Sequence, residues 1–292
     1  MIISNTLHNF KASTSINHFI TILKENPITF FAFLMLFFFL ITAIFGPYFV
    51  PYDPLETNAK IALQPPSINH LFGTDNLGRD VFSRVIVATR LDLTISVLAV
   101  LISFIIGSVL GTMAGYWGGW LDVLLSRFLD TIMAFPLFVL AMGIVAALGN
   151  TIENIIYATA IINIPFYARL VRAEVNIRRE ASFVHAAKMA GNSEFKILAI
   201  HIFPNTLPPM MVQVSLNLGW AILNAAGLSF IGLGVRPPTP EWGIMVAEGA
   251  NFIISGEWWL ALFPGLWLML AVLTFNLLGD GLRDIFDPRK RA

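Results

Sequence analysis

Four polar or amphipathic residues recur at helical spacing along one apolar stretch of the sequence. At intervals of four, three and four, they are Gln213, Asn217, Trp220 and Asn224. These intervals place all four on one face of an α-helix. Because lipid cannot satisfy their hydrogen bonds, such groups contact protein or line a water-filled cavity. The stripe therefore predicts either hydrogen bonding between helices or the lining of a path for a polar solute.

A second pattern predicts two short helices with small apolar faces. Its first set, spaced i, i+3, i+4 and i+7, is Phe183, Ala186, Ala187 and Ala190. The set that repeats this spacing is Phe195, Leu198, Ala199 and Ile202. Between them, Gly191 suits the left-handed residue that ends a helix, and Ser193 and Glu194 suit the cap and first turn of the next. The pair must be covered either by the ends of its own membrane spans or by the groove of a partner protein.

Basic residues surround this predicted helix pair. Four of them are Arg172, Arg178, Arg179 and Lys188. They can pair with acidic groups of a partner, or they can simply hold the segment on the cytoplasmic side near anionic lipid. The sequence leaves both interpretations open.

The sequence contains no known catalytic motif. We find no G-x-x-x-x-G-K-[ST] phosphate loop, no H-E-x-x-H and no Ser, His and Asp arrangement, so we expect no catalytic residue and no cofactor bound by this chain. The lack of cysteine excludes disulfides and thiolate ligands. His70, Asp75 and Asp80 can be drawn as a metal cluster, but they fit caps better, and we expect no metal site.

The composition is typical of a protein that is embedded in a lipid membrane. Hydrophobic residues make up 57% of the 292 residues and charged residues only 12%. Lys plus Arg and Asp plus Glu both number 18, and this balance argues against a nucleic-acid partner.

Six charge-free stretches are candidate membrane spans, since about 20 apolar residues are needed to cross the hydrocarbon core. Their ranges are 28–49, 93–115, 131–148, 154–168, 207–231 and 258–278. The fourth is short and carries Pro165, so we expect it to kink or to extend past Arg169. None has an acidic or basic residue near its centre, unlike most ion-coupled carriers, which indicates that the driving energy comes from elsewhere.

The basic residues predict the orientation. With both termini inside, 13 Lys and Arg residues lie on the cytoplasmic side and 5 outside. The outer connection is then expected to hold a separate interfacial helix with Val81, Phe82, Val85 and Ile86 on one face. In the second outer loop, Trp242 and Trp258–Trp259 predict an aromatic belt or a docking surface for an external partner.

Several motifs resemble one family. Ala186-Ala187-x3-Gly191, with Pro204 thirteen residues after the glycine, resembles the E-A-A-x3-G-x9-I-x-L-P loop of importer permeases in the ATP-binding-cassette superfamily. The chain departs from that pattern in having His185, His201 and Phe203, although H-I-F-P-N at 201–205 is similar to the H-I-L-P-N of the peptide and nickel branch. Further segments similar to that branch are 72–84, 228–234 with 237–243, and 276–284 with 287–288.

This resemblance implies a fold, partners and site residues. The expected fold is an all-α polytopic membrane protein in the bacterial inner membrane, with about six spans, both termini cytoplasmic and a cytoplasmic coupling helix pair. Expected partners are a second homologous permease, two cytoplasmic ATPase subunits that carry ATP and Mg, and an external substrate-binding protein. The residues expected to dock on the ATPase are Phe183, Ala186, Ala187, Ala190, Gly191, Ser193, Glu194 and Pro204.

The expected organisation follows the same resemblance. The segments are a cytoplasmic tail at 1–27, an anchor at 28–49, an outer connection at 50–91, a permease core at 92–279 with a coupling loop at 169–204 and an outer loop at 232–257, and a cytoplasmic tail at 280–292. The implied solute is a di- or oligopeptide, with glutathione, nickel or a metal chelate as alternatives within the family. A self-sufficient channel or secondary carrier is the alternative from another class.

Overall fold

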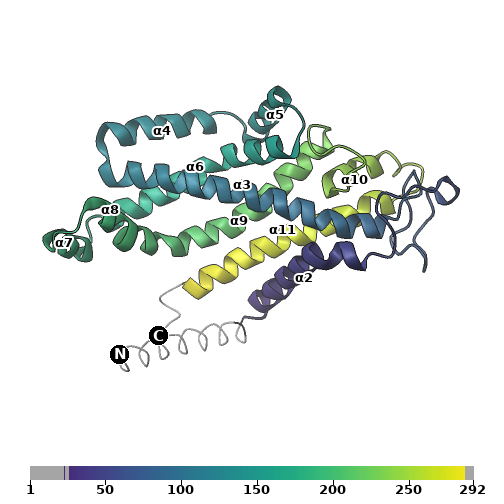
Figure 1. The fold of residues 1–292 in the computed structure, drawn as a ribbon, viewed down its shortest axis with the longest axis horizontal. Coiled ribbons are helices and arrows are strands. Elements are labelled where there is room, and N and C mark those ends of the chain that lie inside the picture. The colour runs from purple at the N-terminus through teal and green to yellow at the C-terminus, as the bar shows by residue number, and fades with distance from the viewer. Residues whose placement is uncertain (1–22, 24–25, 287–292) are drawn as a thin grey trace.

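The computed structural model describes Leu23 and residues 26–286, and these form an elongated helical bundle without a strand (Figure 1). The predicted N-terminal tail therefore lies almost entirely outside the described residues. The elements are α2 (Pro27–Phe49), η1 (Ala59–Ile61), α3 (Val81–Trp117), α4 (Gly119–Met133), α5 (Leu137–Leu148), α6 (Ile152–Arg178), α7 (Ser182–Met189), α8 (Glu194–Lys196), η2 (Ile197–Ile202), α9 (Phe203–Phe230), α10 (Trp242–Ala250) and α11 (Trp259–Phe286).

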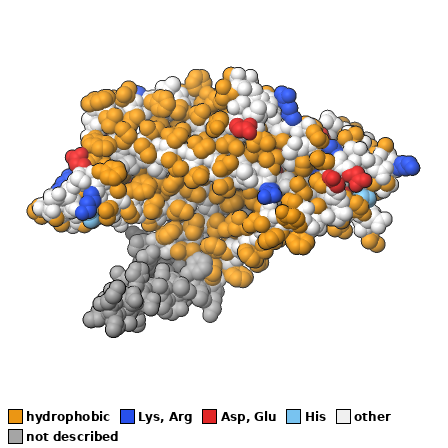
Figure 2. Space-filling model, in the orientation of Figure 1, with side chains coloured by type: hydrophobic (Ala, Val, Ile, Leu, Met, Phe, Trp, Pro, Cys, Tyr) orange, Lys and Arg blue, Asp and Glu red, His pale blue; other side chains and the backbone are white. Residues whose placement is uncertain are grey.

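The outer surface of the bundle is apolar along its length. In Figure 2 hydrophobic side chains cover most of the long face, and charged ones lie mainly toward the two ends with a few between them. Five helical runs in the described chain are long and apolar enough to cross a membrane, and the bent pair α4 and α5 can supply a sixth. The predicted all-α polytopic fold class is confirmed.

The first span agrees with the sequence prediction. Helix α2 begins at Pro27, and the Asn26 side chain accepts hydrogen bonds from the backbone N–H groups of Ile28 and Thr29. Proline is well placed in a first helical turn because its missing N–H would have no partner there.

The second span is longer than predicted. Helix α3 runs unbroken for 37 residues from Val81, so the expected separate interfacial helix before residue 93 is wrong. Asp80 caps it by accepting from the N–H of Ser83 at 2.8 Å. At 1.5 Å per residue, α3 is about 55 Å long and extends well beyond the hydrocarbon core.

The third predicted span, 131–148, is wrong as a single helix. It joins the end of α4 to α5, and these two helices meet at an angle of 85°. The cause is Pro136, which cannot donate a backbone hydrogen bond and disfavours helical geometry at Phe135. The sequence search for charge-free stretches missed most of α4 because that helix carries Asp122, Arg127 and Asp130.

The fourth span extends past Arg169, as one of the two predicted alternatives required. Helix α6 continues to Arg178 and contains Pro165 without a break in the assigned helix. Arg169 pairs with Asp130 at 2.6 Å, so the charges that obscured both helices in the sequence neutralise each other.

Two further boundaries differ from the predictions. The second helix of the predicted cytoplasmic pair is not separate, because α8, η2 and α9 form one helical run from Glu194 to Phe230. The last helix, α11, continues to Phe286, so residues 280–286 belong to the final span's helix rather than to a tail. Both predicted boundaries were placed where the hydropathy of the sequence falls. In the structure each helix continues past that point into the cytoplasmic region.

Close packing of α3 against α6 depends on small residues. A Cβ added at Gly107 would lie 2.6 Å from the Cβ of Tyr167, and one at Gly111 would lie 2.4 Å from the carbonyl oxygen of Ala168. Gly107 and Gly111 are four residues apart in the second predicted span, a small-x-x-x-small spacing that predicts helix packing, and the structure confirms this role.

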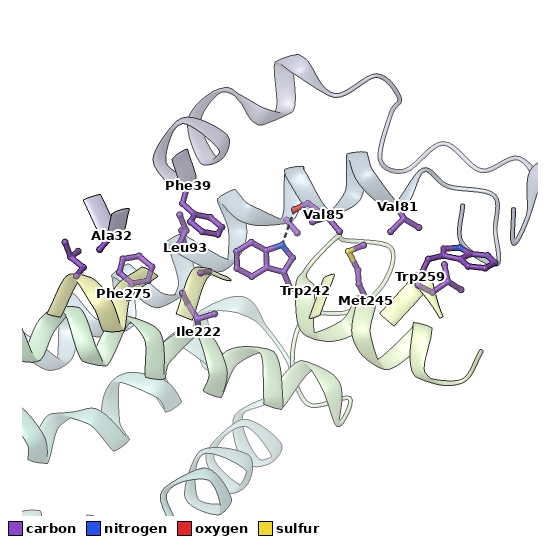
Figure 3. Packing of buried hydrophobic residues seen from close by; sticks show 14 residues of the cluster. Ala32, Phe39, Val81, Val85, Leu93, Ile222, Trp242, Met245, Trp259 and Phe275 are labelled. Carbon is purple, nitrogen blue, oxygen red and sulfur yellow. Dashed lines mark hydrogen bonds between the residues drawn. The ribbon is translucent and has the colours of Figure 1, made fainter. Parts of the chain in front are cut away.

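Trp242 lies in a buried hydrophobic cluster near the external end of the bundle rather than in an aromatic belt (Figure 3). Its side chain is fully buried beside Phe39, Leu93 and Ile222, and its indole N–H donates to the Val85 carbonyl at 3.1 Å. The belt interpretation of Trp242 is therefore wrong. Trp259 is also buried, and its indole N–H donates to the Thr74 carbonyl.

Candidate functional sites

The cytoplasmic end of the bundle carries a sharply turned segment after α7. Gly191 has φ +76°, and its N–H donates to the Lys188 carbonyl. The Asn192 N–H donates to the Ala187 carbonyl, and the Ser193 hydroxyl accepts from the N–H of Lys196. The predicted glycine stop and serine cap are both confirmed.

One face of α7 packs against its own chain. Val184 and Ala187 are buried in a small cluster with residues of the next helical run. The buried partners are Ile197, Leu198, Ile202 and Met210. The chain's own spans therefore cover this face.

The opposite face of α7 and the following turn remain uncovered, and we call this surface the α7 tip. It consists of Phe183, Ala186, Met189, Ala190, Gly191 and Phe195. Met189 is 85% exposed and Phe195 80% exposed. A Cβ added at Gly191 would meet no atom within 4 Å. Of the other predicted docking residues, Ser193, Glu194 and Pro204 are exposed, whereas Ala187 is buried.

The arginines near the α7 tip already have partners within the chain. Arg172 pairs with Asp122, Arg178 with Glu174, and Arg179 with Glu180. Lys188 lies 5.9 Å from the centre of the Tyr116 ring. The three arginines thus have ionic partners without a partner protein, which favours a role in holding this end together.

The predicted polar stripe lines a cavity of about 240 Å³ between helices. Gln213, Asn217, Trp220 and Asn224 all contribute from α9. The remaining lining residues come from α5, α6, α9 and α11, and are Leu137, Ile162, Asn163, Phe166, Leu216 and Asn276. Sequence reasoning missed Asn163 and Asn276, although each is a lone amide in an apolar stretch.

Two hydrogen bonds of the polar stripe lie within α9, and one buried amide nitrogen of the stripe has no hydrogen-bond partner. Gln213 donates to Asn217 at 2.9 Å, and Asn224 donates to the Trp220 carbonyl at 2.9 Å, so both bonds stay within α9. The Nδ2 of Asn217 is buried and approaches the Tyr167 hydroxyl of α6 without forming a hydrogen bond of ordinary geometry. A buried amide donor left in this state is costly unless another group satisfies it.

His70, Asp75 and Asp80, the alternative metal cluster in the outer connection, all have partners within the chain. His70 Nδ1 lies 2.9 Å from Asp80, and Arg79 Nε donates to Asp75 at 2.6 Å. Within residues 26–286 no group of three or more His, Asp or Glu side chains is arranged to hold a metal ion.

Comparison with known proteins identifies two family matches. Residues 107–292 match the binding-protein-dependent transport system inner membrane component, and residues 17–66 match the N-terminal transmembrane domain of oligopeptide transport permease C.

Three relatives illustrate the similarity. A dipeptide transport system permease protein of Alkalihalophilus pseudofirmus is 45% identical over 92% of this chain and 88% of its own. A probable D,D-dipeptide transport system permease protein of Escherichia coli K12 is 42% identical over 91% and 89%. A glutathione transport system permease protein of Pectobacterium atrosepticum is 40% identical over 86% and 83%.

Proposed function

Because this chain belongs to the binding-protein-dependent transport system inner membrane components, and so is a multi-pass permease of the inner membrane, we propose that it forms half of the pathway of an ATP-driven importer of short peptides. The other half is a second, homologous permease. Two cytoplasmic ATPase subunits bind ATP and Mg, and an external binding protein delivers the solute.

The observation that carries this proposal is the uncovered apolar surface of the α7 tip. Its exposed residues include Phe183, Met189 and Phe195 at the cytoplasmic end, away from the lipid-facing length of the bundle. Exposed apolar side chains gain free energy when a partner removes them from water. The small residues Ala186, Ala190 and Gly191 allow another backbone to approach closely. We assign this surface to the ATPase subunit.

The cavity on α9 supports a peptide as the solute. Its amide side chains each offer both a donor and an acceptor, which matches the N–H and C=O groups of a peptide bond. No carboxylate, imidazole or thiolate lines it, so its chemistry favours a peptide over nickel or a metal chelate.

In this proposal, α7 transmits the motion of the ATPase subunits to the cavity. Val184 and Ala187 bind α7 to η2, and η2 continues directly into α9 with the polar stripe. A displacement of α7 by the ATPases is therefore transmitted along one continuous helical run to the cavity. Reopening of the cavity to the opposite side then completes alternating access.

The proposal is tested by Ala186→Trp, which enlarges an exposed side chain on the α7 tip. The assembled importer should lose ATP-dependent peptide uptake and copurification of the ATPase subunits. Ile254→Trp is the matched control, because Ile254 is fully exposed at the external end and should leave ATPase copurification unchanged. Undiminished uptake and copurification in Ala186→Trp would exclude docking there. Transport by this chain alone in liposomes would instead support a self-sufficient channel or carrier.

A further inference from the structure

An apolar groove runs along the bundle between α2, α3, α9 and α11, which are neighbours in the fold (Figure 1). Its volume is about 570 Å³. One end of the groove lies beside Arg90, near the external end of α3, and the other reaches Leu282, near the cytoplasmic end of α11. The groove therefore follows the direction in which the helices cross the membrane.

The lining of this groove is apolar except at its external end. Its two hydroxyl groups are already bonded within the chain, since Ser215 donates to the Phe275 carbonyl at 2.7 Å and Thr94 donates to the Arg90 carbonyl at 2.6 Å. Arg90 is the only charged side chain among the described lining residues. The groove thus combines one cation at its external end with an apolar length.

The guanidinium of Arg90 has no ionic partner in the described part of the chain. Its side chain is exposed, and no carboxylate of residues 26–286 forms an ion pair with it. By contrast, Arg84 on the same helix is buried and lies near Asp75 and Glu248. Arg90 directly precedes the charge-free stretch 93–115, so its long side chain can reach the level of the lipid headgroups.

The groove lies on the face of α9 that is opposite the polar stripe. Met211, Ser215 and Leu218 line the groove, and each comes two residues before a residue of the stripe. A step of two residues turns an α-helix through about 200°. Under the proposed function the stripe faces the path shared with the second permease. The groove then faces lipid, and this one step rests on the proposed function.

We propose that the groove binds one anionic phospholipid, with the lipid phosphate at Arg90 and an acyl chain along the apolar length. A guanidinium binds phosphate oxygens through paired N–H donors. Because no described carboxylate pairs with Arg90, none is placed beside the phosphate to receive the ammonium group of a zwitterionic lipid. Within a bilayer, apolar contact contributes through close packing rather than removal from water, so the charge of Arg90 sets the preference among lipids.

Native mass spectrometry of the purified full chain tests the headgroup contact. The delipidated chain in detergent is titrated with phosphatidylglycerol and, separately, with phosphatidylethanolamine of the same acyl chains. The wild type should bind one phosphatidylglycerol molecule more tightly than phosphatidylethanolamine. Arg90→Gln should weaken phosphatidylglycerol binding about tenfold, as expected for the loss of a charge-assisted contact, and should abolish the preference. Arg236→Gln is the matched control, because Arg236 is an exposed external arginine outside the groove.

Filling the groove tests the contact with the acyl chain. Val97 lines the groove from α3 and is 47% exposed, so the indole of Val97→Trp should displace the chain and weaken phosphatidylglycerol binding. Val109→Trp is the matched control, because Val109 is 54% exposed on the same helix but does not line the groove. It should bind this lipid as the wild type does.

Equal affinity of the wild type for the two lipids would overturn the proposal. Phosphatidylglycerol binding that survives unchanged in both Arg90→Gln and Val97→Trp would do the same. In the assembled importer, a photoactivated cross-linker on Val97→Cys should label lipid, whereas an adduct with the second permease would show that a protein helix occupies the groove and would overturn the site. None of these measurements uses peptide uptake, so failure of the lipid site and failure of the proposed function are distinguishable.

Discussion

The guanidinium of Arg172 on α6 donates to both carboxylate oxygens of Asp122 on α4, with Nη2 at 2.7 Å from Oδ2. This bidentate ion pair joins the cytoplasmic ends of two helices that are neighbours in the bundle. Ser126 also donates to Asp122, so the carboxylate is held from two sides.

Breaking this pair should destabilise the chain modestly. Arg172 is 39% exposed, and solvent screening limits the loss for Asp122→Asn to about 1 kcal/mol of unfolding free energy. Thermal unfolding of Asp122→Asn, Arg172→Gln and the double variant measures it. The double variant should be no less stable than the worse single variant; strictly additive losses would mean that the two residues act independently.

The glycine contacts predict a larger effect. Gly111→Ala should lower the unfolding free energy by about 1 to 3 kcal/mol, because the new methyl group collides with the backbone of α6. Gly143→Ala on α5 is the matched control, since its methyl group meets no atom within 4 Å and should be neutral or slightly stabilising. Equal stability of the two variants would contradict the close packing of α3 and α6.

The packing glycines of α3 could be predicted from the sequence, whereas helix α4 could not. Gly107 and Gly111 could be predicted as packing residues because their spacing alone places them on one helix face. Helix α4 could not be predicted, because Asp122 and Asp130 look incompatible with a membrane until Arg172 and Arg169 are placed beside them. Such pairing joins residues about 40 to 50 positions apart and has no local signal.

The features of the candidate sites that follow local helical spacing could also be predicted, whereas those that depend on contacts between distant segments could not. The stop at Gly191 and the stripe from Gln213 to Asn224 follow helical periodicity, and the structure reproduces both. The buried state of Trp242 and its backbone hydrogen bond to Asp92 depend on how the outer loop folds back on α3. Composition near an expected membrane edge instead suggested an exposed aromatic belt.

The cavity on α9 gives a prediction about transport. Trp220→Ala should weaken peptide uptake about tenfold, the effect of losing about 1.4 kcal/mol of solute contact. Leu223→Ala is the matched control, because Leu223 is similarly exposed on the same helix but does not line the cavity. Uptake of a labelled dipeptide by the assembled importer compares them. Equal uptake by the two variants would remove Trp220 from the path.

The orientation of the bundle can be tested chemically, because the chain contains no cysteine. Ile68→Cys lies in the outer connection and is 96% exposed, whereas Met189→Cys lies on the α7 tip at 85%. In intact spheroplasts a membrane-impermeant maleimide should label only Ile68→Cys, and lysis should make Met189→Cys reactive. The reverse pattern would invert the topology derived from the basic residues.

The most direct test of the central claim is cross-linking from the α7 tip in the assembled importer. Ala186→Cys, carrying a short photoactivated cross-linker, should form a covalent adduct with an ATPase subunit, and Ile254→Cys at the external end should not. An Ala186→Cys adduct only with this chain, with lipid or with the second permease would contradict the account.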